Sequence, residues 1–206
     1  MAAPVFYLLA GPNGAGKSTL YRAAVAEGLI PATAEFINAD LHEAAELQHL
    51  SDPAERSRQA RLWADARRAR CLEEGRSFAS ETVFSHTSKL DLMAAAQRAG
   101  FAVVLLVVCV DDPQQLLARV AQRVQEGGHP VPPERVLSRY PRTVRHLGVA
   151  VRRVDLALLY DTSHPPGEAL QPLRLVARLR SGELRWQADD LPAWAQRVLL
   201  PDTTLR

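Results

Sequence analysis

A glycine-rich segment near the N-terminus gives the strongest chemical signal. It reads Gly11-Pro12-Asn13-Gly14-Ala15-Gly16-Lys17-Ser18 and matches the pattern G-x-x-x-x-G-K-[ST]. Its glycines let successive backbone N–H groups turn toward one anion, and the N-terminus of a following helix attracts the same negative charge. In this pattern Lys17 reaches the β- and γ-phosphates, the Ser18 hydroxyl holds Mg²⁺, and Thr19 adds a contact to the α-phosphate. The segment predicts a P-loop that binds ATP with Mg²⁺.

Asp40 is the acidic residue best placed to act on an attacking hydroxyl. It follows a short expected strand, Glu35 to Asn38, and should therefore lie at the carboxyl edge of the sheet, near the γ-phosphate. A carboxylate there can accept or orient the proton of the acceptor hydroxyl. The alternative is that Asp40 only caps a helix that begins near Leu41. Position alone leaves both interpretations open.

Another expected strand, Ser77 to Glu81, opens onto the same crevice. Glu81, Thr82 and the nearby Ser85 could form hydrogen bonds to an acceptor molecule. The alternative for Glu81 is a solvated strand end.

Two aspartates follow the most apolar expected strand, Phe101 to Val110, where a Walker B acid would stand. We interpret Asp112 instead as the N-cap of a helix that begins at Pro113. Without a clear Walker B acid and glutamate pair, a motor ATPase is disfavoured. The sequence also contains no Asn-Lys-x-Asp motif, which disfavours a GTPase.

Three arginines predict a flap over the nucleotide, at about 112–147. Arg119 and Arg123 are four residues apart on the polar face of an expected helix, and Arg139 follows the break at Gly127-Gly128. A flap that hinges at these glycines would neutralise charge on the transferred phosphoryl group and exclude water. The alternative for each arginine is a solvated surface position.

Strands and helices alternate along the chain, which predicts an α/β fold with a mainly parallel sheet in a single domain, 1–206. The expected strands are Val5–Ala10, Glu35–Asn38, Ser77–Glu81, Phe101–Val110 and Leu156–Tyr160, followed by a hairpin of Arg174–Leu179 and Leu184–Trp186. The expected helices are Lys17–Glu27, Pro53–Glu74, Ser88–Arg98, one from Pro113, one from Pro133 with a kink at Pro141, and Leu191–Leu199. In the second helix, a stripe of Leu62, Ala66, Ala69 and Leu72 should face inward.

Composition excludes several classes of protein. The 206 residues are 47% hydrophobic and 23% charged, which is typical of a globular domain. The net charge of +2 comes from scattered bases, and aromatic residues make up only 6%, so no nucleic-acid surface is expected. No apolar run reaches the roughly 18 residues of a membrane span. The two cysteines lack metal-ligand spacing, and we expect a cytoplasmic protein.

The motifs together resemble the zeta toxin family of P-loop kinases. The resemblance rests on Gly11–Ser18, Ile37–Asp40, Ser77–Thr82, Gly127–Pro132 and Arg139-Tyr140, with weaker support from two C-terminal segments. It implies a three-layer α/β/α P-loop fold with a helical flap, and a kinase that uses ATP or GTP to phosphorylate a sugar hydroxyl of UDP-N-acetylglucosamine.

Residue by residue, the resemblance implies that Asp40 is the catalytic base and that Glu81 and Thr82 contact the sugar. It assigns Arg123 and Arg139 to the transferred phosphate, and it implies an antitoxin protein as a possible partner. Two alternatives stay open: a kinase for another small hydroxyl compound, such as an antibiotic or nucleoside, and a nucleotide-dependent regulatory binding module.

Overall fold

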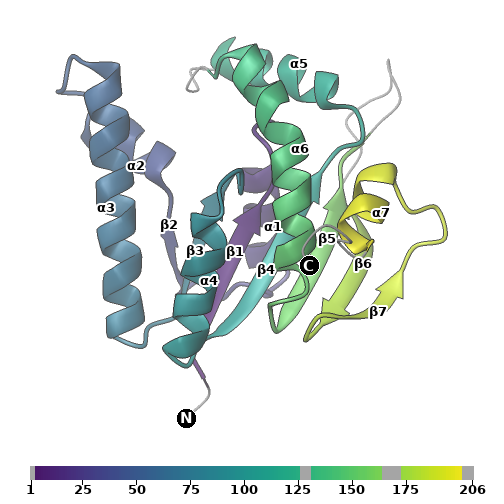
Figure 1. Ribbon diagram of the computed structural model, residues 1–206. Coiled ribbons are helices and arrows are strands. Elements are labelled where there is room, and N and C mark those ends of the chain that lie inside the picture. The colour runs from purple at the N-terminus through teal and green to yellow at the C-terminus, as the bar shows by residue number, and fades with distance from the viewer. Residues whose placement is uncertain (1–2, 126–130, 164–172, 201–206) are drawn as a thin grey trace.

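The strands form one seven-stranded sheet in the computed structural model, which describes residues 3–125, 131–163 and 173–200. The strand order is β2-β3-β1-β4-β5-β6-β7 (Figure 1). The strands are β1 (Val5–Ala10), β2 (Glu35–Ile37), β3 (Phe78–Thr82), β4 (Ala102–Cys109), β5 (Leu156–Asp161), β6 (Arg174–Arg180) and β7 (Glu183–Gln187). The first five are parallel and the last two are antiparallel, so the predicted parallel sheet and terminal hairpin are confirmed.

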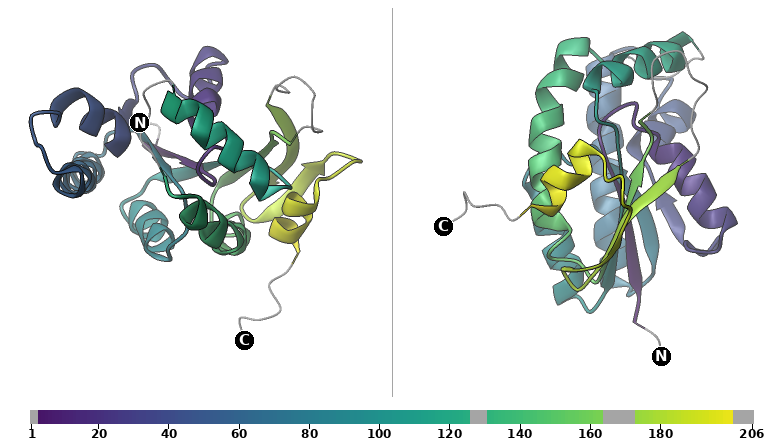
Figure 2. Two further views of the ribbon diagram at one scale, coloured as in Figure 1. Left: turned by 90° about the horizontal axis from the view of Figure 1, so that it is seen from above. Right: turned by 90° about the vertical axis from the view of Figure 1, so that its right-hand side faces the viewer.

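Helices lie on both faces of this sheet. They are α1 (Lys17–Ala26), α2 (Ala39–Glu46), α3 (Pro53–Glu73), α4 (Ser88–Arg98), α5 (Pro113–Gln125), α6 (Pro133–Ala150) and α7 (Ala193–Leu199). Helix α1 covers one face, and α4, α6 and α7 cover the other, while α2 and α3 stand beside the β2 edge (Figure 2). Helix α5 lies across the carboxyl ends of the strands (Figure 1). These layers confirm the predicted α/β/α arrangement.

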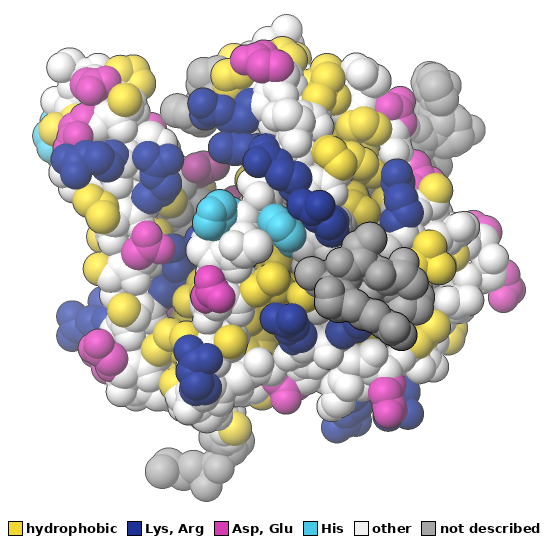
Figure 3. Space-filling model, viewed as in Figure 1, with side chains coloured by type: hydrophobic (Ala, Val, Ile, Leu, Met, Phe, Trp, Pro, Cys, Tyr) yellow, Lys and Arg dark blue, Asp and Glu magenta, His cyan; other side chains and the backbone are white. Residues whose placement is uncertain are grey.

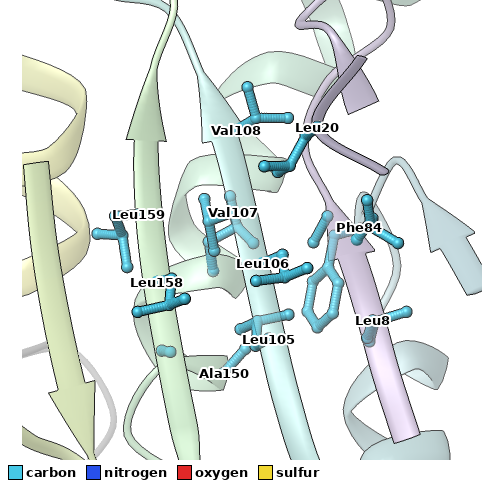
Figure 4. Close-up of a cluster of buried hydrophobic side chains, with 14 of the residues drawn as sticks. Leu8, Leu20, Phe84, Leu105, Leu106, Val107, Val108, Ala150, Leu158 and Leu159 are labelled. Carbon is cyan, nitrogen blue, oxygen red and sulfur yellow. The ribbon is translucent and has the colours of Figure 1, made fainter. Parts of the chain in front are cut away.

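The core is built around β1 and β4, which are apolar on both faces. Phe6 and Leu9 in β1 and the run Leu105–Cys109 in β4 are fully buried, as expected for central strands of a parallel sheet. Side chains from helices and loops, including Leu20 and Phe84, pack on these strands (Figure 4). The apolar runs thus fix the two strands whose ends carry the P-loop and the start of α5.

The prediction for the buried face of α3 is wrong. Leu62 is 52% exposed, and the buried positions are Ala60, Ala64, Arg68 and Cys71. Arg68 decides the orientation, because its guanidinium donates to Ser80 Oγ at 3.2 Å and pairs with the carboxylate of Asp65. A polar interaction between helix and sheet therefore outweighs a weak apolar stripe.

The two helices of the predicted flap span most of its expected range. Asp112 caps α5 by accepting a hydrogen bond from Gln114 N at 2.9 Å, so the N-cap interpretation is confirmed. Helix α6 continues through Pro141 to Ala150. The predicted hinge at Gly127-Gly128 lies outside the described residues. No helix among the described residues is long and apolar enough to cross a membrane.

A buried polar network joins α7 to the sheet. The carboxylate of Asp111 accepts hydrogen bonds from Ala193 N at 3.1 Å and Trp194 N at 2.6 Å, and so caps α7 from a distance in sequence. The indole Nε1 of Trp194 donates to Asp161 Oδ1 at 2.7 Å. Both the Trp194 ring and Asp161 are buried. The acid after β4 thus has a structural role.

We expect Trp194→Phe to lower the free energy of unfolding by about 1–2 kcal/mol, because it removes one donor from a buried carboxylate while keeping most of the ring. Chemical denaturation measures the change. The control is Trp186→Phe on β7, a residue that is 47% exposed. Equal stability of Trp194→Phe and the native chain would contradict the role given to this hydrogen bond.

Candidate active site

The loop between β1 and α1 is held tightly by neighbouring backbones. A Cβ atom on Gly11 would lie 2.0 Å from Val108 O of β4, so only glycine fits there. Gly11 N donates to Thr82 O at 3.2 Å, which fastens the loop to β3 on its other side. Gly16 precedes α1 with φ 99°, a left-handed conformation that favours glycine. The motif's glycines therefore have identifiable steric causes.

Lys17 lies in the first turn of α1 and folds back over the loop. Its Nζ donates to Gly11 O at 3.1 Å and to Pro12 O at 3.2 Å. Burial lowers the pKa of Lys17, while the negative charges of Glu81 and Asp40 act in the opposite direction. These two acids therefore face the same space as the lysine, although Glu81 lies in β3 and Asp40 in α2.

Helix α2 places Asp40 at the edge of this space. The side chain of Asn38 accepts a hydrogen bond from Leu41 N at 3.2 Å and so caps the helix. Asp40 lies in the first turn of α2, is exposed, and lines the cavity described below. The interpretation of Asp40 as the helix cap is thus wrong, because Asn38 has that role.

Strand β3 brings Glu81 and Thr82 directly beside the end of β1. In the parallel register Glu81 lies opposite Leu9 and Thr82 opposite Ala10. Glu81 Oε2 is buried and has no hydrogen-bond partner among the described residues. A buried carboxylate oxygen without a partner is costly unless a ligand satisfies it. This orphaned oxygen therefore points to a cation or a hydrogen-bond donor that binds at this position.

The segment after β3 is held in a strained form. Phe84 is fully buried with φ 61°, a conformation that costs an aromatic residue about 1–2 kcal/mol. Thr143 Oγ1 of α6 donates to Val83 O at 3.0 Å, and His146 Nδ1 lies 3.2 Å from Phe84 O. The buried ring and α6 together hold the following Ser85 at the cavity wall.

These elements enclose a cavity of about 600 Å³. Five parts of the chain line it: Asn13 and Lys17; Asn38, Ala39, Asp40 and Glu43; Ser57, Ala60 and Arg61; Glu81, Thr82, Val83, Phe84, Ser85, His86 and Lys89; and Arg123, Val131, Pro132, Arg135 and Arg139. Six of these side chains are lysines or arginines and three are Asp or Glu, so the wall suits an anionic ligand.

The three flap arginines lie in different places. Arg123 lines the cavity, and its positive charge lowers the pKa of Lys17 further. Arg139 also lines the cavity, from α6. Arg119 lies outside this lining, and its guanidinium donates to Thr162 Oγ1 at 3.0 Å and to Thr162 O at 2.6 Å. Since Thr162 Oγ1 donates to Ala15 O at 3.1 Å, Arg119 is joined to the P-loop through that threonine.

Several cavity residues were missed by sequence reasoning. Arg135 could have been found, because it precedes Arg139 by four residues and so shares its helix face. Arg61 and Lys89 carried no signal, since each is one base among many on a polar helix. Their place in the cavity depends on tertiary packing.

Ser18 and Glu81 are the residues that could hold a magnesium ion. Ser18 is exposed at the start of α1, and Glu81 has the orphaned oxygen. The described residues contain no cluster of three or more His, Cys, Asp or Glu able to bind a metal by themselves. Magnesium in nucleotide sites is bound through one or two protein oxygens together with substrate phosphates, which these two residues fit.

Comparison with solved structures finds the same fold in other proteins. A structure of the PezAT chromosomal toxin-antitoxin system of Streptococcus pneumoniae matches 78% of this chain and 68% of its own, with a TM-score of 0.59 and 18% identity. The complex AvrRxo1-ORF1:-ORF2 with ATP matches 98% of this chain, with a TM-score of 0.67 and 18% identity, and this chain spans 66% of that one.

A proposed kinase from Chloroflexus aurantiacus matches 62% of this chain and 70% of its own, with a TM-score of 0.50 and 22% identity. At these identities the likeness shows the fold alone. The comparison with curated proteins gave no match.

A family model extends the likeness from fold to sequence. The model of the AAA domain (AAA_33) matches residues 7–147, a range that begins within β1 and ends in α6. It therefore includes the P-loop, all three cavity acids and the three flap arginines. Because it covers more than half of the 206 residues, the chain belongs to the AAA domain family (AAA_33) and has the fold of a P-loop nucleoside triphosphatase.

Proposed function

We propose that this protein is a kinase that transfers the γ-phosphoryl group of ATP to a hydroxyl of a small molecule. The observation that supports this best is the position of Asp40, which lines the same cavity as Lys17. Because Asn38 caps α2, the carboxylate of Asp40 is not used as the helix cap. A carboxylate facing a phosphate loop across a cavity of about 600 Å³ leaves room for an alcohol between them.

In the proposed reaction the P-loop, Asp40 and the flap arginines have separate roles. The P-loop amides and Lys17 bind the phosphates of ATP, and Lys17 exchanges its contacts to Gly11 O and Pro12 O for phosphate oxygens. Asp40 accepts the hydroxyl proton as the new oxygen–phosphorus bond forms and the bond to the ADP oxygen breaks. Arg123 stabilises the charge of the transferred group. Thr19 and Arg119 remain proposed contacts to the nucleotide.

Magnesium fits this site through Ser18 and Glu81. The bound ion would neutralise phosphate charge and orient the γ-phosphoryl group. This assignment gives Glu81 a role toward the metal in place of the sugar contact implied by the resemblance, and it explains why one of its oxygens is buried without a partner. Thr82 and Ser85 remain the proposed contacts to the acceptor.

As the acceptor we propose UDP-N-acetylglucosamine or a related amino sugar. The resemblance to the zeta toxin family supports this choice, and the basic cavity wall suits the diphosphate. The test incubates the protein with ATP, Mg²⁺ and a panel of this nucleotide sugar, free amino sugars, nucleosides and aminoglycosides, followed by mass spectrometry. Transfer to another member only would replace the proposed acceptor, and no transfer with a nucleotide-dependent protein complex would favour the regulatory module.

A protein antitoxin is a further proposed partner, taken from the same resemblance. It is tested by co-expression with neighbouring open reading frames and by growth of cells that express the native chain or a Lys17→Ala variant.

We expect Asp40→Asn to lower kcat by about 10²–10⁴-fold while ATP binding stays unchanged, because the amide keeps the shape but cannot take the proton. Lys17→Ala should lose both transfer and nucleotide affinity. Stopped assays give kcat, and a fluorescent ATP analogue gives the affinity. The matched control is Glu46→Gln on the same helix, an exposed residue outside the cavity. Transfer by Asp40→Asn at the native rate would remove the base from this mechanism.

Glu81→Gln should raise the Mg²⁺ concentration needed for tight ATP binding by roughly tenfold, because the side chain loses its negative charge toward the metal. Binding without Mg²⁺ should change little. The readout is nucleotide fluorescence during a Mg²⁺ titration, which does not depend on turnover. Glu27→Gln, at the exposed end of α1, serves as the control. Identical Mg²⁺ curves for Glu81→Gln and the native chain would exclude Glu81 as a metal-site residue.

A further inference from the structure

Five of the six basic side chains of the cavity wall form two groups, and the sixth is Lys89. The first consists of Lys17 and Arg123, whose charges act on one another beside Glu81 and Asp40. The second consists of Arg61 from α3 and of Arg135 and Arg139, which are four residues apart on α6. Basic side chains on α6 and on α3 lie on opposite sides of a hollow in the surface (Figure 3). The second group therefore borders the hollow from two sides, with Arg61 on one and Arg135 and Arg139 on the other.

The second group, Arg61, Arg135 and Arg139, brings positive charges together without a carboxylate paired to them. Burial lowers the pKa of Arg139, and so do the positive charges of Arg135, Arg142 and Arg61. Within the described parts of the chain, no acidic side chain forms an ion pair with Arg61, Arg135 or Arg139.

Other arginines of α3 are paired. Arg58 donates to both oxygens of Glu55 at 2.8 and 2.7 Å, and Arg67 donates to Glu35. The lack of acidic partners is thus specific to the arginine that lines the cavity.

We propose that Arg61, Arg135 and Arg139 form a second anion site, which binds a phosphate or diphosphate group of the acceptor. The proposal rests on the proposed function, since it takes the cavity to be an acceptor site. It makes Arg61 and Arg135 specificity residues, and it gives Arg139 a partner other than the γ-phosphate.

The positions of these arginines indicate that they bind the acceptor and not the donor ATP. ATP phosphates bind at the loop after β1, whereas α3 stands beyond β2, at the edge of the sheet (Figure 1). Helix α3 packs on α2, which carries Asp40. A molecule whose hydroxyl faces Asp40 can therefore extend toward Arg61, on the side away from the P-loop.

The number of arginines indicates that the anionic group of the ligand is a phosphate and not a carboxylate. One guanidinium can occupy both oxygens of a carboxylate in a bidentate pair. Three guanidiniums supply more donors than a single carboxylate can accept, whereas a diphosphate offers enough oxygens for all of them. Phosphorylated acceptors should therefore bind better than neutral sugars.

The test is a calorimetric titration with the P-loop already filled by Mg²⁺ and a non-hydrolysable ATP analogue. The probes are inorganic pyrophosphate, UDP-N-acetylglucosamine and neutral N-acetylglucosamine. We expect the two anionic probes to bind the native chain, and Arg61→Gln to weaken them by about tenfold to a hundredfold. Arg135→Gln should act in the same direction. Arg58→Gln, on the same helix but outside the cavity, should bind like the native chain.

Equal binding of pyrophosphate by Arg61→Gln and the native chain would overturn the proposal. So would a failure of pyrophosphate to bind the native chain whose P-loop is filled by the nucleotide analogue. Arg61 is exposed, so circular dichroism should show that the variant keeps its fold. Equal transfer efficiency with neutral and phosphorylated acceptors would also overturn the second site but would leave the kinase intact. Arginine-dependent binding without any transfer would support the site and refute the kinase.

Discussion

Close contact between three backbones, at the point where β1 ends, determines the rest of this site. Gly11 lies so near Val108 O that no side chain fits, and its N–H is bonded to Thr82 O of β3. The loop is thus fixed by its two neighbouring strands before any ligand binds. Such rigidity matters because backbone amides stabilise phosphate charge best when they need no reorganisation. The apolar residues of β1 and β4 hold this arrangement in place.

The strand order then determines which acids meet the loop. Since β3 and β2 follow β1 on one side of the sheet, Glu81 and Asp40 come from adjacent strand ends. On the other side, Asp111 and Asp161 are used to attach α7. Acidic residues thus lie at or just after the ends of the four strands that flank β1, two on each side, and only the pair on the β2–β3 side lines the cavity. Sequence position alone gives all four a similar appearance.

Sequence reasoning succeeded where a short pattern has one steric or chemical meaning. The P-loop needs its glycines, the apolar runs predict β1 and β4, and Asp112 before Pro113 predicts a cap. It failed where a residue's environment is created by distant segments. The face of α3 was misjudged because Arg68 bonds to Ser80 across twelve residues. Arg61 was missed because only the packing of α3 against α2 brings it to the cavity.

Helix α6 connects the two walls of the cavity mechanically. It runs without interruption from Pro133 to Ala150, with Arg135 and Arg139 near its start and Thr143 and His146 further along. The latter two contact the carbonyl groups of Val83 and Phe84, next to the proposed acceptor contacts. One helix thus contributes both to the basic wall of the cavity and to the support of the strained segment after β3. In the proposed function, α6 would therefore link the arginines that bind the acceptor to the segment that carries Ser85.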